Sequence, residues 1–390
     1  MNGHSGEPYG GRLVNRLVSD VKRPTLLKQA EEIASIKLDE DAIYDAEKIG
    51  IGAYSPLEGF MNNNEFLSVL AGGRLANGLP WTIPIVMAPS GKENAAIVKE
   101  LKEGDTAALL DVNGKPFAIL RLEEKFSIDK KECAMKVYGT TDRAHPNVHD
   151  IYTLGNVALA GNIDLIRKLD LKAGKFELTP LDCRRAFKER GWKNVVAYQC
   201  RNPPHTAHEY LQRCALELAE VDGLFIHPVV GRLKKGDYKP EVIMQAYDVL
   251  VKGYYRRDRT LLASLSITMR YGGPKAALFL AIVRRNYGCT HYIVGRDQAG
   301  VGSYYDPYAC HKIFEEYDVG IAPIRFMETF FCRRCGWMAT PKTCPHGAED
   351  HVSMSQTKVR GLLEKGNTLP REILRPEVES ILNRGDVFVS

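Results

Sequence analysis

The chain has 390 residues, of which 44% are hydrophobic and 26% charged, a composition that excludes a disordered or fibrous protein. At roughly 100–200 residues per domain, two or three domains are expected. The net charge of +5 is too small an excess for wholesale nucleic-acid binding. No run approaches the roughly 18 apolar residues of a membrane span, and the polar start lacks a secretory signal, so we expect no membrane association and a cytoplasmic location.

Residues 1–165 are predicted to form a small β-rich domain. Short β-type runs, such as Trp81–Met87 and Thr106–Val112, are broken by Gly, Asn and Pro. Asn113-Gly114 separates the second of these runs from Lys115–Leu120, and Asn-Gly is typical of a hairpin turn. We therefore expect two antiparallel strands joined at this point.

Residues 166–322 alternate between apolar strand-like runs and segments with helical spacing. Thr179 is a suitable N-cap for a helix over Pro180–Lys188. The other predicted elements are strands at Asn194–Tyr198, Gly223–Pro228 and His291–Gly295 and a helix at Ala207–Ala219. This alternation indicates a parallel sheet with helical crossovers.

The segment after the strand at Asn194–Tyr198 concentrates groups that bind oxyanions. It lies at the carboxyl end of a strand and at the start of a helix, where ligands and phosphates bind in such folds. His205 and His208 are three residues apart and share one face of the first helical turn, while Arg201 supplies a planar fork of donors. The alternative is a surface turn with two capping histidines, but the combination favours an oxyanion site.

A cysteine cluster near the C-terminus has the spacing of a structural zinc site. Cys332 and Cys335 form a knuckle, and Cys344 with His346 completes a set of three thiols and one imidazole, which satisfies tetrahedral Zn²⁺. His351 is an alternative fourth ligand, because only one residue separates His346 from Cys344. Free thiols on a loop are the competing interpretation. A zinc ribbon for nucleic acid is disfavoured, because few basic side chains accompany the cluster.

Several segments resemble conserved blocks of the ATP sulfurylase (sulfate adenylyltransferase) family, in its prokaryotic single-function type. They are Ser55–Met61, Gly139–Pro146, Gln199–His208, Gly231–Asp237, Met269–Pro274, Asn286–His291 and Gly295–Gly302. The resemblance implies an α/β protein with a PUA-like β-rich domain at 1–165, a Rossmann-like nucleotidyltransferase domain at 166–322 and a small α/β domain at 323–390 with a zinc-binding insertion. It also implies a homodimer.

The reaction implied by the resemblance is attack of sulfate on the α-phosphorus of ATP, giving adenosine 5′-phosphosulfate and pyrophosphate, with Mg²⁺ on the phosphates. Sulfate needs no deprotonation, so positioning and charge stabilisation are expected to dominate catalysis. One alternative is another adenylyltransferase of the His-x-x-His superfamily. A second is a zinc-containing RNA-binding or RNA-modifying protein. The Gln-x-Arg-Asn-Pro run favours the sulfurylase, because it places an arginine just before the histidines.

The resemblance also implies roles for individual residues. The catalytic residues would be Cys200, Arg201, Asn202, His205 and His208, the sulfate ligands Gln199, Arg201 and the backbone at Ala299, and the ATP ligands Gln199, Asn202, Gly295, Arg296, Asp297, Gln298 and Met327. Cys200 and Gln298 depart from the family, which usually has Thr and His there, and we expect tuned activity rather than its loss. Arg270 is interpreted either as steering anions or as packing. Lys358 and Arg360 are interpreted either as phosphate contacts or as a solvated helix start.

Overall fold

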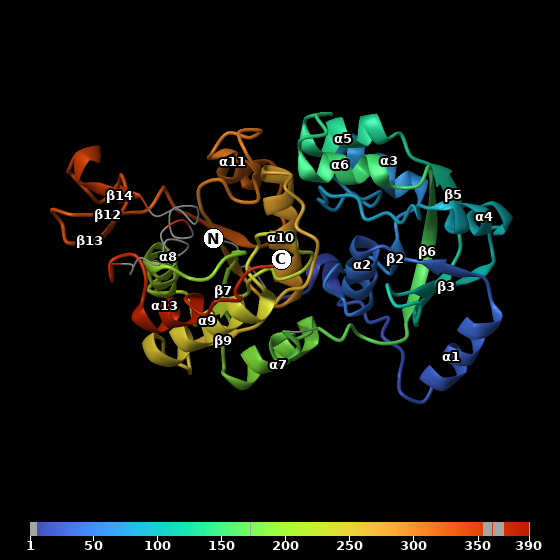
Figure 1. The fold of residues 1–390 in the computed structure, drawn as a ribbon, viewed down its shortest axis with the longest axis horizontal. Helices are drawn as coiled ribbons and strands as arrows, with labels where there is room; N and C mark the ends of the chain where they lie inside the picture. Colours follow the sequence, from blue (N-terminus) through green and yellow to red (C-terminus); the bar gives the residue numbers. More distant parts are fainter. Residues whose placement is uncertain (1–5, 172, 354–360, 362–369, 390) are drawn as a thin grey trace.

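The computed structural model describes residues 6–171, 173–353, 361 and 370–389. Two large parts lie side by side, the N-terminal part in blue and green and the central part in yellow and orange, and a small three-stranded sheet projects at the far end (Figure 1). Among the described helices, none combines the length and apolarity needed to cross a bilayer.

The N-terminal part is built on a mixed six-stranded sheet of order β1-β3-β4-β6-β2, with β5 also pairing with β6. The strands are β1 (Ser35–Lys37), β2 (Gly59–Phe60), β3 (Thr106–Leu110), β4 (Pro116–Arg121), β5 (Glu124–Ser127) and β6 (Val157–Leu165). The expected hairpin is confirmed, because β3 and β4 pair antiparallel. Gly114 in its turn has a φ of 75°, which glycine adopts without strain.

Six helices of the described chain surround this sheet, in addition to the strands that the sequence predicts. They are α1 (Arg23–Glu32), α2 (Glu40–Gly50), α3 (Asn63–Gly72), α4 (Lys92–Glu100), α5 (Lys130–Tyr138) and α6 (Pro146–Thr153). The expected strand at Trp81–Met87 is wrong: only Met87 forms an isolated bridge, with Leu159. Trp81 and Ile85 are fully buried, so the run is apolar because it lies in the core, and Pro84 lacks the N–H that a ladder requires.

The central part is a parallel five-stranded sheet of order β11-β10-β7-β8-β9. Its strands are β7 (Val195–Tyr198), β8 (Gly223–Ile226), β9 (Thr260–Leu262), β10 (His291–Val294) and β11 (Ala322–Arg325). Taken in chain order, this is the 3-2-1-4-5 arrangement of Rossmann-like folds, and the order reverses between β7 and β10. The predicted parallel sheet is therefore confirmed. The boundary expected at residue 322 falls inside β11.

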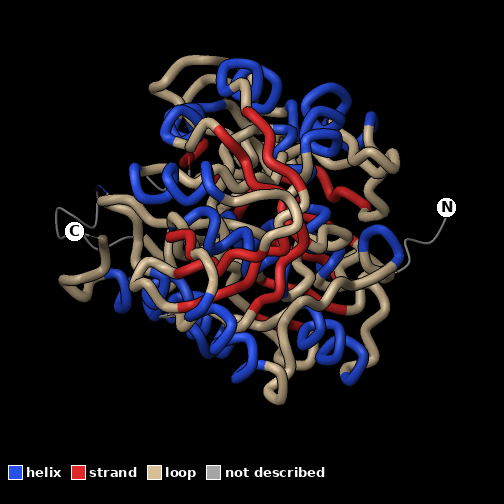
Figure 2. Tube along the Cα trace, turned by 90° about the vertical axis from the view of Figure 1, so that its right-hand side faces the viewer, coloured by secondary structure: helices blue, strands red, loops and turns tan. Residues whose placement is uncertain are grey.

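Helices pack on both faces of this sheet. Figure 2 shows the strands of the molecule (red) mostly inside and the helices (blue) mostly around them. The helices are α7 (Pro180–Glu189), α8 (Thr206–Leu216), α9 (Pro240–Tyr254), α10 (Pro274–Asn286) and α11 (Ala309–Glu316). Val195 and Ala197 pack into the core cluster that contains α10, whereas Val196 and Tyr198 pack into the cluster that contains α9. The predicted N-cap of α7 is confirmed, because Thr179 forms a capping box with Asp182.

The C-terminal region contains two different structures. The small antiparallel sheet consists of β12 (Phe330–Cys332), β13 (Trp337–Ala339) and β14 (His351–Ser353), with β12 in the middle. The helix α13 (Pro376–Leu382) instead packs against α9 of the central part. The chain therefore returns to the central part after the small sheet.

Candidate functional site

The loops that follow β7 and β10 form the centre of the candidate site. These two strands are neighbours, with His291 opposite Val196 and Tyr292 opposite Ala197. Their carboxyl ends meet where the strand order reverses, and open α/β sheets bind ligands in the crevice at this position. The first loop carries Gln199 and the second begins at Gly295. The structure thus brings together two motifs that lie almost one hundred residues apart.

A chain of hydrogen bonds joins these two loops through Tyr292. The Tyr292 hydroxyl donates to Gln199 Oε1 at 3.2 Å, and Gln298 Nε2 donates to the Tyr292 oxygen at 2.6 Å. The Gly295 N–H donates to Gln298 Oε1 at 3.1 Å. Gln298 therefore fixes the loop while remaining neutral. Tyr292 is absent from the sequence-based set, because as one residue of an apolar strand it gives no signal of a polar role.

The loop after β10 contains two unusual backbone conformations. Asp297 and Ala299 have φ values of 53° and 56°, and they are the non-glycine residues with positive φ in the described part of the chain. Such conformations are sparsely populated and persist where the surroundings impose them. The Ala299 carbonyl accepts a hydrogen bond from the Gly273 N–H at 3.0 Å, which is one such restraint. These two residues are also ones to which the family resemblance assigns a ligand, ATP for Asp297 and sulfate for the backbone of Ala299.

At two positions in the neighbouring loops, the structure has room only for glycine. A Cβ on Gly231 would lie 1.9 Å from the Ile267 carbonyl oxygen, so only glycine allows this approach of the two backbones. Gly273 has a φ of 52°, and a Cβ there would lie 2.6 Å from the Tyr305 ring. The glycines in these two motifs therefore shape the loops after β8 and β9.

The two histidines lie at the start of α8 and stack on each other. Their ring centroids are 3.7 Å apart with an interplanar angle of 19°. The backbone N–H of His205 donates to His208 Nδ1 at 3.4 Å, so this nitrogen of His208 is an acceptor and Nε2 carries the proton of the neutral ring. His205 Nδ1 is buried and has no hydrogen-bond partner in the described part of the chain.

Burial keeps both imidazoles neutral. It lowers the pKa of His205 to about 4. Burial, followed by the neighbouring His205, lowers the pKa of His208 well below its usual value. Near pH 7 the pair therefore offers neutral hydrogen-bond donors rather than positive charges.

Arg201 is held at the edge of a small pocket. Its Nη2 donates to Asp237 Oδ2 at 3.2 Å, and its Nη1 donates to the Tyr271 hydroxyl. Burial lowers the pKa of Arg201, and the Asp237 carboxylate opposes this shift. The guanidinium is thus a partly buried charge with a fixed orientation, as recognition of an oxyanion requires.

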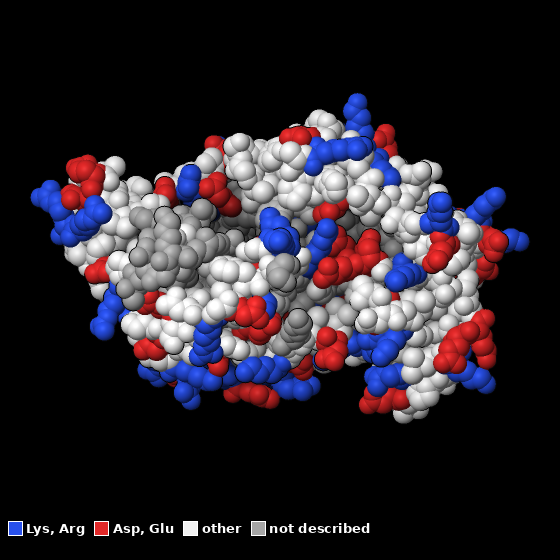
Figure 3. Space-filling model, in the orientation of Figure 1, with Lys and Arg blue, Asp and Glu red and all other residues white. Residues whose placement is uncertain are grey.

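The pocket beside Arg201 has a volume of about 100 Å³ and is lined by both basic and acidic side chains. Arg201, Arg232 and Lys234 line it together with Asp150 and Asp237. A larger cavity of about 490 Å³ adjoins it on the side of the N-terminal part and is lined by several aspartates, including Asp39 and Asp45. Figure 3 shows the hollow between the two parts with acidic and basic side chains gathered around it. Basic side chains outnumber acidic ones in the smaller pocket, whereas the reverse holds in the larger cavity.

Cys200 lies in the same loop, and its thiol forms hydrogen bonds with α9 and with the backbone of the loop. Its Sγ lies 2.6 Å from the Tyr247 hydroxyl on α9 and donates to the Asn202 carbonyl at 3.2 Å. Burial raises the pKa of the Cys200 thiol to about 11. This side chain therefore acts on the site through the backbone of the loop, which carries the partly buried Asn202.

For the reaction that the family resemblance implies, replacing Cys200 with threonine is expected to change kcat and both KM values by less than about threefold. The hydroxyl keeps a donor toward the Asn202 carbonyl, and no polar group is added to the pocket. Steady-state kinetics of pyrophosphate release measure the effect. A change of two orders of magnitude would show that the thiol itself takes part in the chemistry.

The remaining assigned residues lie at the same edge of the sheet or outside the described residues. Met327 follows the end of β11, and Arg296 is exposed beside Asp297 and Glu328. Arg270 packs against the N-terminal part, where it pairs with the buried Asp45 at 2.5 Å, which supports packing rather than steering. Lys358 and Arg360 lie outside the described residues.

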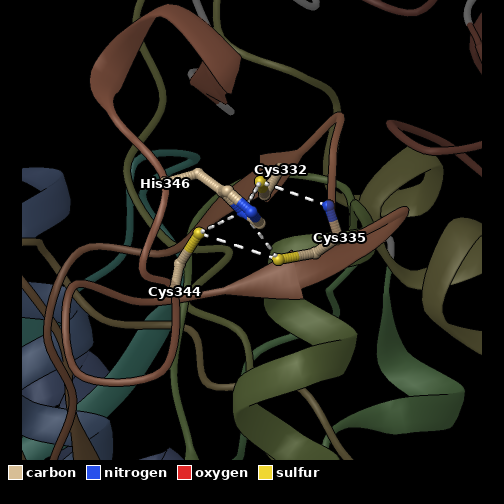
Figure 4. Close-up of side chains that lie close together, drawn as sticks. All are labelled: Cys332, Cys335, Cys344 and His346. Carbon is tan, nitrogen blue, oxygen red and sulfur yellow. Dashed lines mark hydrogen bonds between the residues drawn. The ribbon is translucent and has the colours of Figure 1, made fainter.

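The cysteine cluster is assembled as a metal-binding group (Figure 4). The ligand atoms of Cys332, Cys335, Cys344 and His346 all lie within 4.8 Å of one another. His346 Nδ1 lies 3.3, 3.3 and 3.6 Å from the three sulfurs, whereas His351 approaches Cys344 alone, at 3.7 Å. A tetrahedral Zn²⁺ with bonds of about 2.3 Å separates its ligands by about 3.8 Å. The donor set therefore fits zinc, with His346 as the fourth ligand.

The cluster also lies close to α8, the helix that carries His208 and follows His205, which is called the histidine helix below. The Thr206 hydroxyl of α8 points toward the Met338 sulfur of β13 at 3.7 Å. Trp337, the first residue of that strand, is 71% exposed. The small sheet thus contacts α8 on one side and presents an aromatic ring to solvent on the other.

Comparison with known proteins agrees with this architecture. A family model described as ATP-sulfurylase matches residues 174–385, and one described as PUA-like domain matches residues 6–168. Sulfate adenylyltransferase from Halothermothrix orenii is 44% identical over 384 residues, which cover 97% of this chain and 99% of that protein. The chain belongs to the ATP-sulfurylase family. The sulfate adenylyltransferase from Staphylothermus marinus is 46% identical over 384 residues, which cover 98% of this chain and 99% of that protein.

A solved structure supports the fold of this family member. The hexameric APS kinase from Thiobacillus denitrificans superposes with a TM-score of 0.77 over 97% of this chain and 68% of that one, at 24% identity. The ATP-sulfurylase match, which extends to residue 385, includes the cysteine cluster and α13. The PUA-like N-terminal domain and the central nucleotide-binding fold are both as the sequence predicts.

Proposed function

We propose that this chain is a sulfate adenylyltransferase, which converts ATP and sulfate reversibly into adenosine 5′-phosphosulfate and pyrophosphate. The observation that carries the proposal is the meeting of two family motifs at the point where the strand order reverses. There the Gln199 and Gln298 side chains are joined through Tyr292, beside the fixed guanidinium of Arg201. Nothing in the described residues favours another adenylyltransferase.

In this proposal, Arg201, Gln199 and the backbone N–H of Ala299 hold sulfate. A sulfate oxygen is already ionised at neutral pH, so no general base is needed and the work of the site is alignment with the α-phosphorus. The Asp237 carboxylate keeps the Arg201 fork directed into the pocket.

ATP is proposed to lie along the same edge of the sheet. The loop from Gly295 to Gln298 would contact the adenosine, Met327 would pack against adenine, and Asn202 would contact the phosphates. The neutral donors of His205 and His208 would stabilise the negative charge that develops on the phosphoryl oxygens and the departing pyrophosphate. Because both rings are neutral, their hydrogen bonds strengthen in the transition state without repelling Mg²⁺.

Mg²⁺ is proposed to arrive with the ATP phosphates. It retains several waters and is bound mainly through substrate phosphates in such sites, so it needs no protein cage. In the described ranges, the Cys/His cluster is the group of metal-ligating side chains that qualifies as a preformed site. When bound, the ion would supply charge neutralisation at the phosphates.

The test is pyrophosphate release from ATP with sulfate or with molybdate as the acceptor. Sulfate reactions need added pyrophosphatase, because the equilibrium favours ATP. We expect anion-dependent release with both acceptors. Absence of release with either anion would contradict the proposal.

The Cys/His cluster is proposed to hold structural Zn²⁺ through Cys332, Cys335, Cys344 and His346. Four protein ligands leave no open position for a substrate, so the ion would stabilise the small sheet rather than act on ATP. A homodimer and a cytoplasmic location are further proposals that rest on the family.

Replacing Cys335 with serine is expected to abolish zinc binding and to lower the melting temperature by about 5–10 °C, because the folding free energy of the small sheet depends on the ion. Metal analysis and differential scanning calorimetry measure the two effects. Cys214→Ser, outside the cluster, is the matched control and is expected to retain the metal. Full zinc content in Cys335→Ser would exclude the assigned ligand set.

A further inference from the structure

The C-terminal segment makes close contacts with the first turn of the histidine helix. The backbone N–H of Thr206 donates to the Ile373 carbonyl at 3.0 Å. Arg375 forms a bidentate pair with Glu209, with Nε 3.0 Å from Oε1 and Nη2 2.9 Å from Oε2. Glu209 is 4% exposed and directly follows His208, so this pair fixes the helix beside the stacked rings.

The end of the same segment contacts the loop that carries the partner of Arg201. The Val389 N–H donates to the Asp237 carbonyl at 2.9 Å, and the Gly236 N–H donates to the Val389 carbonyl at 3.0 Å. Phe388 forms an antiparallel bridge with Tyr238, and their rings lie 4.7 Å apart. Asp237 is thus held through its backbone by the C-terminal segment while its carboxylate orients Arg201.

These contacts reach two different parts of the proposed site. One end of the segment holds the helix that carries His205 and His208. The other end holds the loop that orients Arg201. The helix α13 between them packs on α9, which gives the segment a rigid centre. The hydrogen bonds to Asp237 and Thr206 are made by backbone atoms, so a family motif does not reveal them.

We propose that residues 372–389 form a brace that positions both halves of the site, with Arg375 setting the histidine helix and Val389 setting the Asp237–Arg201 pair. The inference rests on the proposed function of the site. Arg375 and Val389 are positioning residues, since each acts through another group. If these residues form a brace, substitutions at its two ends should change different kinetic constants.

The first arm of the test changes the Arg375 end. Arg375→Gln is expected to lower kcat about tenfold while the KM for sulfate stays within about twofold, because the histidines act on the transition state. Arg375→Lys keeps the charge without the fork and is expected to recover part of the rate. Arg384→Gln, an exposed arginine of the same segment, is the control. Should the unpaired Glu209 destabilise the fold, the double variant Glu209→Gln, Arg375→Gln removes both charges and retains the test.

The second arm changes the Val389 end. Val389→Pro removes the N–H that donates to Asp237, and we expect it to raise the KM for sulfate about fivefold with kcat within about twofold. Val389→Ala retains the N–H and separates loss of the hydrogen bond from loss of the side chain. Equal effects of both ends on kcat and KM would indicate a merely structural role and overturn the proposal.

Hydrogen exchange gives a readout that does not depend on activity. In the full-length protein, Arg375→Gln is expected to accelerate exchange in the first turn of α8, and Val389→Pro in the loop from Gly231 to Asp237. Unchanged exchange together with unchanged kinetics would refute the brace. A wild-type protein that releases no pyrophosphate would refute the proposed function, while the exchange pattern would still decide the brace.

Discussion

Arg201→Ala is expected to lower kcat/KM for sulfate by a factor of about 10²–10³, which corresponds to about 3–4 kcal/mol. The substitution removes a fixed, partly buried guanidinium from the pocket. It also leaves the Asp237 carboxylate without its 3.2 Å partner, so a negative charge then faces the incoming anion. The KM for ATP is expected to change much less. Initial rates over a range of sulfate concentrations measure the effect.

Two further variants separate the causes of this loss. Arg201→Lys retains charge without the planar fork, and we expect an intermediate loss of about tenfold. Adding Asp237→Asn to Arg201→Ala removes the repelling carboxylate and is expected to recover part of the activity. Arg256→Ala, an exposed arginine paired with Asp258, is the control. An unaltered sulfate dependence in Arg201→Ala would remove Arg201 from the sulfate site.

His205→Asn and His208→Asn are each expected to lower kcat by a factor of about 10²–10³, the effect of losing one donor to a developing oxyanion. The stacked rings act together, so the double variant is expected to lose far less than the product of the two single effects. The exposed His149→Asn is the control. Strictly multiplicative losses would argue that the rings act independently.

The same histidines make stability dependent on pH. The pKa of His205 is about 4 in the folded chain and about 6.5 in an unfolded one, so between these values the unfolded chain binds more protons. Stability from keeping this ring neutral is present above pH 6.5 and is lost as the pH falls toward 4. The melting temperature of His205→Asn is therefore expected to fall less than that of the wild type between pH 7 and pH 5.

Local sequence signals predicted the elements that depend on local chemistry. Asn113-Gly114 indicated a hairpin and Thr179 indicated a helix start, because turn and cap preferences reside in a few adjacent residues. The strand expected at Trp81–Met87 was wrong because apolar residues indicate burial, and a buried segment need not pair with a neighbouring strand. The run Ala322–Arg325 is too short to be predicted as a strand from its sequence, and it contains a proline. Its place in the central sheet is seen only from its pairing with β10.

The candidate site shows the same division. The residues of the strand–turn–helix and the cysteine knuckle were recognisable because their spacing carries the chemistry. Tyr292 gave no such signal, and Asp237 stood out only as the end of the family-like block Gly231–Asp237, since each becomes important through contact with a distant residue. Arg270 was left between two interpretations, because its partner Asp45 lies in another domain. The direction of the Cys200 thiol likewise depends on Tyr247, which the sequence gives no reason to connect with it.

The bidentate bond between Glu209 and Arg375 has a consequence for the synthesis of the chain on the ribosome. Translation produces Glu209 of α8 first and supplies its partner Arg375 166 residues later. Throughout that interval the Glu209 carboxylate lacks the arginine with which it pairs in the folded chain. The parallel sheet can therefore form before Arg375 is available to fix the start of α8, so the site is expected to reach its full rate only once the segment that carries Arg375 has been made.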